Sequence, residues 1–259
     1  MHKFTDTKEE QRLKALREYN LIDTNVDFDF ILEAIATICE VPLCSIIAVY
    51  EDDLIIIAST GIKIHKQHKR LGSCTEFTIH KNEFCEIYDI KDQEGINDST
   101  YLLENFDIVF YAGCPLVDPQ GNNLGTLNIY DDKPRILNEQ QKYFIGKAAD
   151  RIVTLFLHKR QEQRLLHFDN MFGKSKDIMG IVRFDGEILK VNPSFSKLLG
   201  YEENEIFHHK MLNFVHPSYK EEAKASIKRF TNGVSEVNYT LPLVTKNNEI
   251  KWVEWTSTH

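Results

Sequence analysis

The apolar residues of the first 138 positions recur with two different periods. Residues 8–19 and 27–39 place apolar side chains three and four positions apart, which predicts two amphipathic helices. Further along, apolar runs are separated by residues that favour tight turns, and this pattern predicts strands joined as hairpins. The expected strands lie at 44–50, 54–59, 86–90, 108–117 and 124–130. A short helical piece is expected at 99–105, and the whole pattern predicts an antiparallel sheet flanked by helices.

A long helix is predicted after this sheet. Asn138 is a suitable N-cap, and Glu139 follows it in the first turn, where a negative charge is favourable. Apolar residues then recur at helical spacing, with an interruption at Lys159, Glu162 and Gln163. The first half, 139–156, is expected to pack on the first domain. The second half is expected to pair with the same helix of a second copy, which predicts a homodimer. The apolar positions are Phe144, Ala148, Ile152, Leu155, Leu165, Leu166 and Phe168.

The last ninety residues alternate between apolar runs and short helical stretches. The turn sequences Asp185-Gly186 and Asn247-Asn248 join neighbouring runs. The expected strands are 178–184, 187–191, 235–245 and 249–257, and the expected helices are 193–200, 202–207 and 217–230. A chain of 259 residues has the length of two domains. The sequence therefore predicts an α+β protein with domains at 1–138 and 169–259, joined by a long helix at 139–168.

Composition and charge narrow the classes of function. The chain is 42% apolar and 27% charged, as is usual for globular proteins. No apolar run is long enough to span a bilayer, and the N-terminus lacks the apolar core of a signal peptide, so a cytoplasmic protein without a membrane partner is expected. Residues 1–138 carry 13 basic and 24 acidic side chains, a net charge of −11. This charge argues against nucleic-acid binding.

The cysteines do not indicate a disulfide framework or a metal centre. Their spacing is irregular and contains no C-x-x-C pair, so reduced thiols are expected. Cys and His do not cluster at zinc spacings, and no metal site is expected. The five cysteines are Cys39, Cys44, Cys74, Cys85 and Cys114.

Several motifs of the first 160 residues occur in the order and spacing of a known family. They are Arg12-Leu13-Lys14-Ala15-Leu16, Leu21-Ile22-Asp23-Thr24, Val41-Pro42, Phe110-Tyr111-Ala112-Gly113-Cys114-Pro115-Leu116, Gly121 and Leu124-Gly125-Thr126-Leu127. On these motifs the region resembles GAF domains of bacterial sensor proteins, in the subgroup whose first helix reads R-L-x-x-L. The resemblance implies a sheet that encloses a small pocket. The candidate lining residues are Cys74, Phe77, Tyr88, Asn128 and Tyr130.

A second set of motifs begins near residue 168. It comprises Asp185-Gly186, Val191-Asn192-Pro193-Ser194-Phe195, Leu199-Gly200-Tyr201, Val215-His216-Pro217 and Ile250-Lys251-Trp252-Val253-Glu254-Trp255. On these residues the region resembles a PAS domain of the kind found in sensor kinases. Such domains continue past the W-x-x-W segment into one more strand, which lies in the middle of the sheet. The chain is therefore expected to lack the final PAS strand and any effector domain.

Catalytic motifs are absent from the sequence. No G-x-x-x-x-G-K-[ST], G-x-S-x-G or H-E-x-x-H segment occurs. Some GAF proteins reduce free methionine sulfoxide, and Gly72-Ser73-Cys74 resembles part of their motif, but Asn97–Thr100 stands where they carry a further essential cysteine. No cofactor is expected, because the Cys-His pair of bilin proteins, the flavin motif N-C-R-F-L-Q and a haem signature are missing.

The expected function is therefore regulatory and not enzymatic. The chain is interpreted as the sensory input module of a bacterial signal-transduction protein, with a two-component sensor histidine kinase as the favoured type. A small ligand or a protein contact would bias the connecting helix, which requires two packing arrangements of similar free energy. Two alternatives stay open: a structural dimerisation module without a ligand, and a GAF-type free methionine sulfoxide reductase. The sequence names neither the signal nor the effector.

Overall fold

The chain divides into two compact units. The computed structural model describes residues 7–23, 25–61, 67–96, 107–231 and 236–258. The first unit spans residues 1–163 and the second spans residues 164–259, so the division falls inside the long helix. The expected short helix at 99–105 and the segment Asn97–Thr100 lie outside the described residues.

The first unit is built on a six-stranded antiparallel sheet. Its strand order is β3-β2-β1-β6-β5-β4. The strands are β1 (Leu43–Val49), β2 (Asp53–Thr60), β3 (Gln67–Lys69), β4 (Cys85–Ile87), β5 (Phe110–Val117) and β6 (Asn123–Asp131). Each strand expected from the sequence is confirmed to within a few residues. The sequence did not indicate β3, because Gln67-His68-Lys69 contains no apolar residue.

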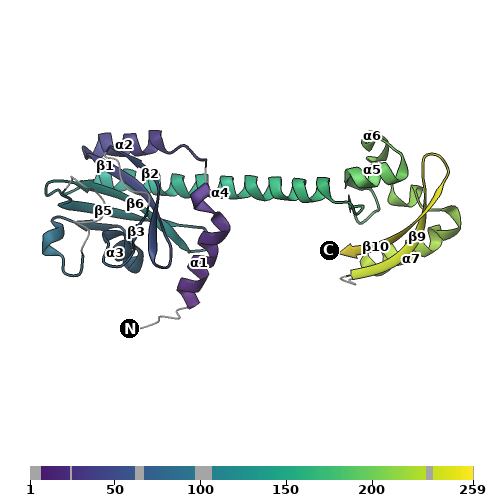
Figure 1. Ribbon diagram of the computed structural model, residues 1–259, viewed down its shortest axis with the longest axis horizontal. Helices are drawn as coiled ribbons and strands as arrows, with labels where there is room; N and C mark the ends of the chain where they lie inside the picture. Colours follow the sequence, from purple (N-terminus) through teal and green to yellow (C-terminus); the bar gives the residue numbers. More distant parts are fainter. Residues whose placement is uncertain (1–6, 24, 62–66, 97–106, 232–235, 259) are drawn as a thin grey trace. The chain divides into compact units, whose positions relative to one another are not determined.

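Three helices cover one face of this sheet (Figure 1). They are α1 (Thr7–Tyr19), α2 (Asp29–Cys39) and the first part of α4 (Glu139–Lys174). Their apolar side chains share one core with alternate residues of the sheet, and the Phe28 and Phe156 rings meet edge to face with centroids 5.5 Å apart. The prediction that the helices near 27–39 and 139–156 lie on one face is confirmed.

The helix α3 (Cys74–Lys81) lies over the opposite face. Leu43, Ile47 and Val49 of β1 point to this side, whereas Cys44, Ile46 and Ala48 point toward α1, α2 and α4. The pattern of the sequence did not predict α3, because two of the four residues that it buries, Thr75 and Thr78, are polar, and its apolar stripe is too weak to be recognised. Both faces of β1 and β6 are therefore buried.

The long helix α4 begins where the sequence predicts. The Asn138 side chain accepts a hydrogen bond from the Gln141 backbone N–H at 2.9 Å, and the Gln141 side chain accepts one from the Asn138 N–H at 2.9 Å. This reciprocal cap satisfies two of the free N–H groups at the start of the helix. The helix continues to Lys174, beyond the expected end at 168.

The second unit contains two separate antiparallel pairs of strands. The pair β7 (Gly180–Val182) and β8 (Ile188–Val191) precedes the helices α5 (Pro193–Leu199), α6 (Glu203–Ile206) and α7 (Lys220–Thr231). The second pair is β9 (Glu236–Val244) and β10 (Ile250–Thr258). Short 3-10 turns complete the described helices at Leu21–Asp23, Ile90–Asp92, Met211–Asn213 and Pro217–Tyr219. The α+β class with an antiparallel arrangement in each unit is confirmed.

Asn192 explains why the N-P-x-F motif starts a helix. Its side-chain oxygen accepts hydrogen bonds from the backbone N–H groups of Phe195 at 3.1 Å and Met179 at 3.0 Å, and its amide donates to the Asp177 carbonyl at 2.8 Å. Pro193 occupies the first helical position, where its missing N–H removes no helix bond. One fully buried side chain therefore caps α5 and fixes the segment that leads into β7.

Candidate functional site

The α3 side of the first sheet carries a row of buried polar side chains on its two central strands. Ser45 of β1 lies opposite Asn128 of β6, and Thr126 of β6 lies opposite Ile47. The exposed fraction of Ser45, Thr126 and Asn128 is 0%. Their neighbours along each strand point to the helical face, so the alternation of the strand selects these polar groups for the α3 side.

Two further polar groups connect this row to α3. The Tyr111 hydroxyl of β5 donates a hydrogen bond to the Asn128 side-chain oxygen at 2.9 Å and lies 2.7 Å from the Thr78 hydroxyl of α3. Gly113 makes room for this contact, because a Cβ atom there would stand 2.1 Å from the Tyr111 hydroxyl oxygen. Ser45, Thr78, Tyr111, Thr126 and Asn128 together form the polar cluster.

Part of the hydrogen-bonding capacity of the polar cluster is unused. Among the described residues, the Asn128 amide nitrogen and the hydroxyl groups of Ser45 and Thr126 have no hydrogen-bond partner. A buried polar group without a partner costs about 1–3 kcal/mol, and native proteins contain few of them. The polar cluster contains no Asp, Glu, Lys, Arg or His. It therefore offers neutral hydrogen-bonding groups to a small molecule or to buried water.

The cover of the polar cluster is a helix with well-defined ends. Ser73 caps α3, because its hydroxyl accepts a hydrogen bond from the Glu76 N–H at 3.0 Å. Asn82 ends α3 in the left-handed conformation, with φ at 53°. Its side-chain oxygen accepts a hydrogen bond from the Asn123 amide at 3.1 Å, which holds this end of α3 to the start of β6.

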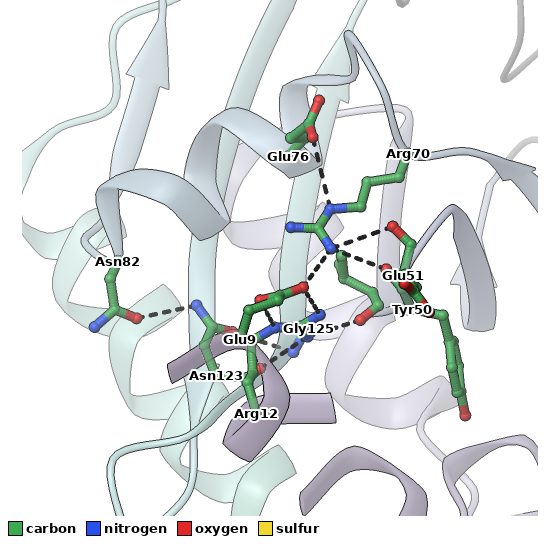
Figure 2. Close-up of polar contacts among 10 residues, drawn as sticks. Glu9, Arg12, Tyr50, Glu51, Arg70, Glu76, Asn82, Asn123 and Gly125 are labelled. Carbon is green, nitrogen blue, oxygen red and sulfur yellow. Dashed lines mark hydrogen bonds and ion pairs between the residues drawn. The ribbon is translucent and has the colours of Figure 1, made fainter. Parts of the chain in front are cut away.

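A partly buried ionic network holds the other end of α3 (Figure 2). The network consists of Glu9 and Arg12 of α1, Arg70 in the segment before α3, and Glu76 of α3. Glu9 accepts hydrogen bonds from Arg12 at 2.7 and 2.8 Å and from Arg70 at 2.6 Å. The Arg70 Nε lies 3.6 Å from a Glu76 carboxylate oxygen. The hydrogen bonds from Arg12 are the largest cause that lowers the pKa of Glu9, to about 2, and burial opposes them. Glu9 is therefore ionised at neutral pH.

The candidate pocket residues named from the sequence occupy different environments. Cys74 and Tyr130 are fully buried in one cluster with Tyr111, and the Tyr111 and Tyr130 ring centroids are 5.5 Å apart. Asn128 belongs to the polar cluster. Phe77 is half-buried and packs against the cluster that contains Cys74 and Tyr130. The Lys81 ammonium lies 4.5 Å from the centroid of the Phe77 ring. Tyr88 is 54% exposed.

Four members of the polar cluster were missed at the sequence level: Ser45, Thr78, Tyr111 and Thr126. A signal for two of them exists in the sequence. Ser45 interrupts the apolar run from Leu43 to Val49, and Thr126 stands within Leu124–Tyr130. A polar residue inside a strand that is buried on both faces needs a partner, and this requirement marks it as a candidate. Thr78 and Tyr111 could not be found this way, because their proximity depends on the placement of α3.

Four of the five thiols lie in environments that favour the protonated form. None of the five cysteines forms a disulfide, and Cys39, Cys44, Cys74 and Cys85 are buried. Burial raises the pKa of the Cys39 and Cys114 thiols to about 11, and it also raises the pKa of Cys44 and Cys85. A thiol reacts as its thiolate, so these environments disfavour nucleophilic chemistry. Within the described ranges, no group of three or more His, Cys, Asp or Glu side chains could hold a metal ion.

The second unit contains a cavity of about 590 Å³ beside the backbones of β7 and β10. Phe195, Tyr239 and Trp255 contribute aromatic side chains, and Glu254 and Asp177 also lie at its lining. Gly180, Ile181 and Val182 of β7 are exposed, although the strand is apolar. Each two-stranded pair has an edge without a strand partner among the described residues. This cavity is the second candidate site.

A family model described as the PAS fold matches residues 188–258. One curated relative, a cyclic di-GMP phosphodiesterase of Pseudomonas aeruginosa, is 28% identical over 152 residues. The alignment covers 58% of this chain and 24% of the relative, so the chain spans about a quarter of the length of that protein. Within the part of the chain that the structure describes, no helix is sufficiently long and apolar to cross a membrane.

Solved structures of both types are similar to parts of the chain. The GAF domain of a phosphoenolpyruvate-protein phosphotransferase from Coxiella burnetii is 15% identical, with a TM-score of 0.46, and covers 61% of this chain and 98% of that chain. The free methionine-R-sulfoxide reductase of Neisseria meningitidis is 13% identical, with a TM-score of 0.44, and the match covers 60% of this chain and 91% of the reductase chain. A domain of a sensory box sensor histidine kinase/response regulator from Geobacter sulfurreducens is 22% identical, with a TM-score of 0.33, and the match covers 36% of this chain and 81% of that domain's chain.

The prediction of a GAF-like region followed by a PAS-like region is confirmed. The family model carries the PAS assignment, and the six-stranded sheet order with the motifs of the first unit carries the GAF assignment. The described chain therefore combines a GAF-like fold in its first unit with a PAS-like fold in its second.

Proposed function

We propose that this chain is the sensory input region of a bacterial signal-transduction protein and that its first unit binds a small neutral molecule. The observation that carries the proposal is the unused hydrogen-bonding capacity of Ser45, Thr126 and Asn128. A ligand with hydrogen-bond acceptors would satisfy the Asn128 amide, and the two hydroxyl groups can donate or accept. A charged ligand fits less well, because the polar cluster supplies no countercharge.

In this proposal the signal is transmitted through α4, because the first part of α4 shares a core with the sheet. A two-component sensor histidine kinase is the favoured whole protein. The similarity to a cyclic di-GMP phosphodiesterase supports a phosphodiesterase as the alternative effector. In both cases the described chain carries regulation and not turnover, and its ligand is held without a covalent bond or a metal.

The test of the ligand site is the nearly isosteric substitution Thr126→Val, which removes one unpaired hydroxyl. If a ligand uses this hydroxyl, the variant should bind it on the order of tenfold more weakly. Buried water is the competing occupant. If only water fills the site, the variant should be as stable as the wild type or more stable, and no ligand should distinguish the two proteins. Thr240→Val, on an exposed position of β9, is the matched control.

A second proposed function is dimerisation through the C-terminal half of α4. Leu165, Leu166 and Met171 are more than half exposed there, at 65%, 55% and 53%. Apolar side chains at helical spacing bury area when a second helix covers them. Light scattering should therefore show a dimer that Leu165→Glu weakens and that Glu162→Gln, an exposed neighbour on the same helix, leaves intact. A wild-type monomer at high concentration would contradict this proposal.

A further inference from the structure

The helix α1 contacts the structures that hold both ends of α3. At the N-terminal end of α3, Glu9 accepts a hydrogen bond from Arg70. Arg70 in turn donates to the Tyr50 carbonyl at 3.1 Å, and its own carbonyl accepts a hydrogen bond from the Ser73 hydroxyl at 2.8 Å. Because Ser73 is the cap of α3, the position of Arg70 determines where α3 begins.

Glu76 strengthens this link from the side of α3. One carboxylate oxygen lies near the Arg70 Nε, and the other accepts a hydrogen bond from the Gly72 N–H at 2.8 Å. Hydrogen bonds and an ion pair between its own residues thus close the segment from Arg70 to Glu76. Glu9 of α1 binds this segment from outside, together with the carbonyls of Tyr50 and Glu51 (Figure 2). A displacement of α3 that carries this segment with it must break the contact between Glu9 and Arg70.

Arg12 supplies the contact at the other end. Its guanidinium donates to the Val49 carbonyl at 2.7 Å and to the Asn123 carbonyl at 3.3 Å, and its exposed fraction is only 6%. The Asn123 side chain is the group that binds Asn82 at the C-terminal end of α3. Glu9 and Arg12 therefore sit between the two anchors of α3, and they also bind each other.

The other end of α1 contacts α4. The Arg160 guanidinium of α4 lies over the Tyr19 ring, 4.7 Å from its centroid, and forms an ion pair with Glu18. Tyr19 is buried in the same core as Phe156 of α4. A single helix thus contacts the anchors of α3 with its N-terminal turns and α4 with its last turn.

We infer that α1 couples the position of α3 to the packing of α4. This inference rests on the proposed function, since α3 covers the polar cluster and α4 carries the output. When α3 lifts together with the segment from Arg70 to Glu76, Glu9 loses its contact with Arg70, and α1 loses one of the contacts that hold it in place beside α4. Energetic coupling of this kind is reciprocal, so loosening α4 at Arg160 also loosens α3.

Hydrogen exchange on the full chain without any ligand tests the coupling. Glu9→Gln keeps the shape of the side chain but removes its charge, and the α3 amides at 75–82 should exchange on the order of tenfold faster. The control is Glu10→Gln, at the exposed neighbouring position, which should leave these amides unchanged. The β1 amides should also keep their protection, which shows that the fold is intact.

The decisive variant lies at the far end of α1. Arg160→Met removes the contacts with Glu18 and Tyr19, and the α3 amides should again exchange several-fold faster. Lys159→Met is the control, because its ion pair partner Glu162 lies on α4 itself. Unchanged α3 exchange in Arg160→Met would overturn the coupling, and equal acceleration of α3 and β1 would show general destabilisation instead and would also overturn it. Since no ligand is present, these failures are distinct from a failure of Thr126→Val to affect binding.

Discussion

The two units use their strands in different ways. In the first unit every residue of β1 and β6 is buried, because α1, α2 and α4 cover one face of the sheet and α3 covers the other. In the second unit the sheet is divided into two pairs, β7 is exposed, and β10 alternates between exposed and partly buried positions. In the first unit both edges of each central strand are hydrogen-bonded to a neighbouring strand. In the second unit, strand edges without a strand partner among the described residues lie beside a cavity of about 590 Å³.

This difference indicates a division of roles. A complete sheet with unpaired polar side chains in its interior is suited to a ligand that meets specific groups. Strand edges beside a cavity are suited to an extended segment, since free backbone groups pair with another strand. The expectation that one more strand belongs between β7 and β10 stays a prediction, and the position of the cavity is consistent with it.

The largest expected difference is in hydrogen exchange. The amides of β1 and β6 should exchange at least about a hundredfold more slowly than those of β7 and β10, because opening the central strands requires unfolding of the first unit. Native-state exchange with fragment analysis measures both units in one sample. Equal protection of β7, β10 and β1, with no added strand, would remove the contrast and the prediction of a missing strand.

Two glycines sharpen the comparison of packing. A Cβ atom at Gly125 of β6 would stand 2.1 Å from the Ile47 carbonyl oxygen, whereas one at Gly180 of β7 would meet its nearest atom, the Lys190 carbonyl oxygen, at 3.5 Å. Gly125→Ala should therefore destabilise the first unit by about 3 kcal/mol. Gly180→Ala should change the second unit by less than about 1 kcal/mol. Urea unfolding followed with a probe in each unit measures the pair, and a similar loss for both variants would refute the packing difference.

Acid should act differently on the two units. The pKa of Glu9 is lowered to about 2, so the stability that its ionised form contributes is fully present above its ordinary pKa of 4.5 and is lost as the pH falls through 2. Glu9→Gln should lower the free energy of opening α3, and not that of β1, by about 1.4 kcal/mol at pH 7, which is the tenfold faster exchange expected above, and this difference should shrink toward pH 2. In the second unit, hydrogen bonds from His208 and Lys246 lower the pKa of Glu187 and Glu205, but both carboxylates are partly exposed to solvent, so their substitution should have a smaller effect.

The smallest expected effect concerns the thiols, all of which lie in the first unit. Cys74, the candidate nucleophile, is fully buried. Because burial raises the pKa of the other four thiols, Cys39, Cys44, Cys85 and Cys114, few of these four form thiolates at neutral pH. Incubation with free methionine sulfoxide and a thiol reductant should yield no methionine above the blank. Turnover that Cys74→Ser abolishes would instead establish the reductase alternative.

The strands and long helices were predictable because their patterns are local. Ile108–Val117, the turn near Gly121 and Leu124–Tyr130 form a hairpin that any choice of tertiary partners would preserve. The cap at Asn138 likewise depends on residues within one turn. The short elements β3 and α3 were not predictable, since β3 consists of three polar residues and two of the four residues that α3 buries are threonines, so neither shows a clear apolar pattern.

The candidate site was predictable only in part, for a related reason. Asn128 and Tyr130 are two positions apart on β6, so they face the same side of the sheet, which is the α3 side. These two of the named residues could therefore be assigned to one face from the sequence. The hydrogen bonds from Thr78 through Tyr111 to Asn128 join α3, β5 and β6, which are distant in sequence. The ionic network depends in the same way on Glu9 meeting Arg70 across 61 positions. Contacts of this kind depend on tertiary packing, so the local pattern of apolar and polar residues cannot predict them.

The central claim is that the polar cluster binds a small neutral molecule, and native mass spectrometry of the intact chain tests it most directly. The purified wild type and Thr126→Val would be incubated with pools of neutral metabolites that carry hydrogen-bond acceptors. The account predicts a discrete added mass on the wild type that is strongly reduced on Thr126→Val and unchanged on Thr240→Val. An added mass that is equal on all three proteins, or its absence from the wild type together with higher stability of Thr126→Val, would contradict it.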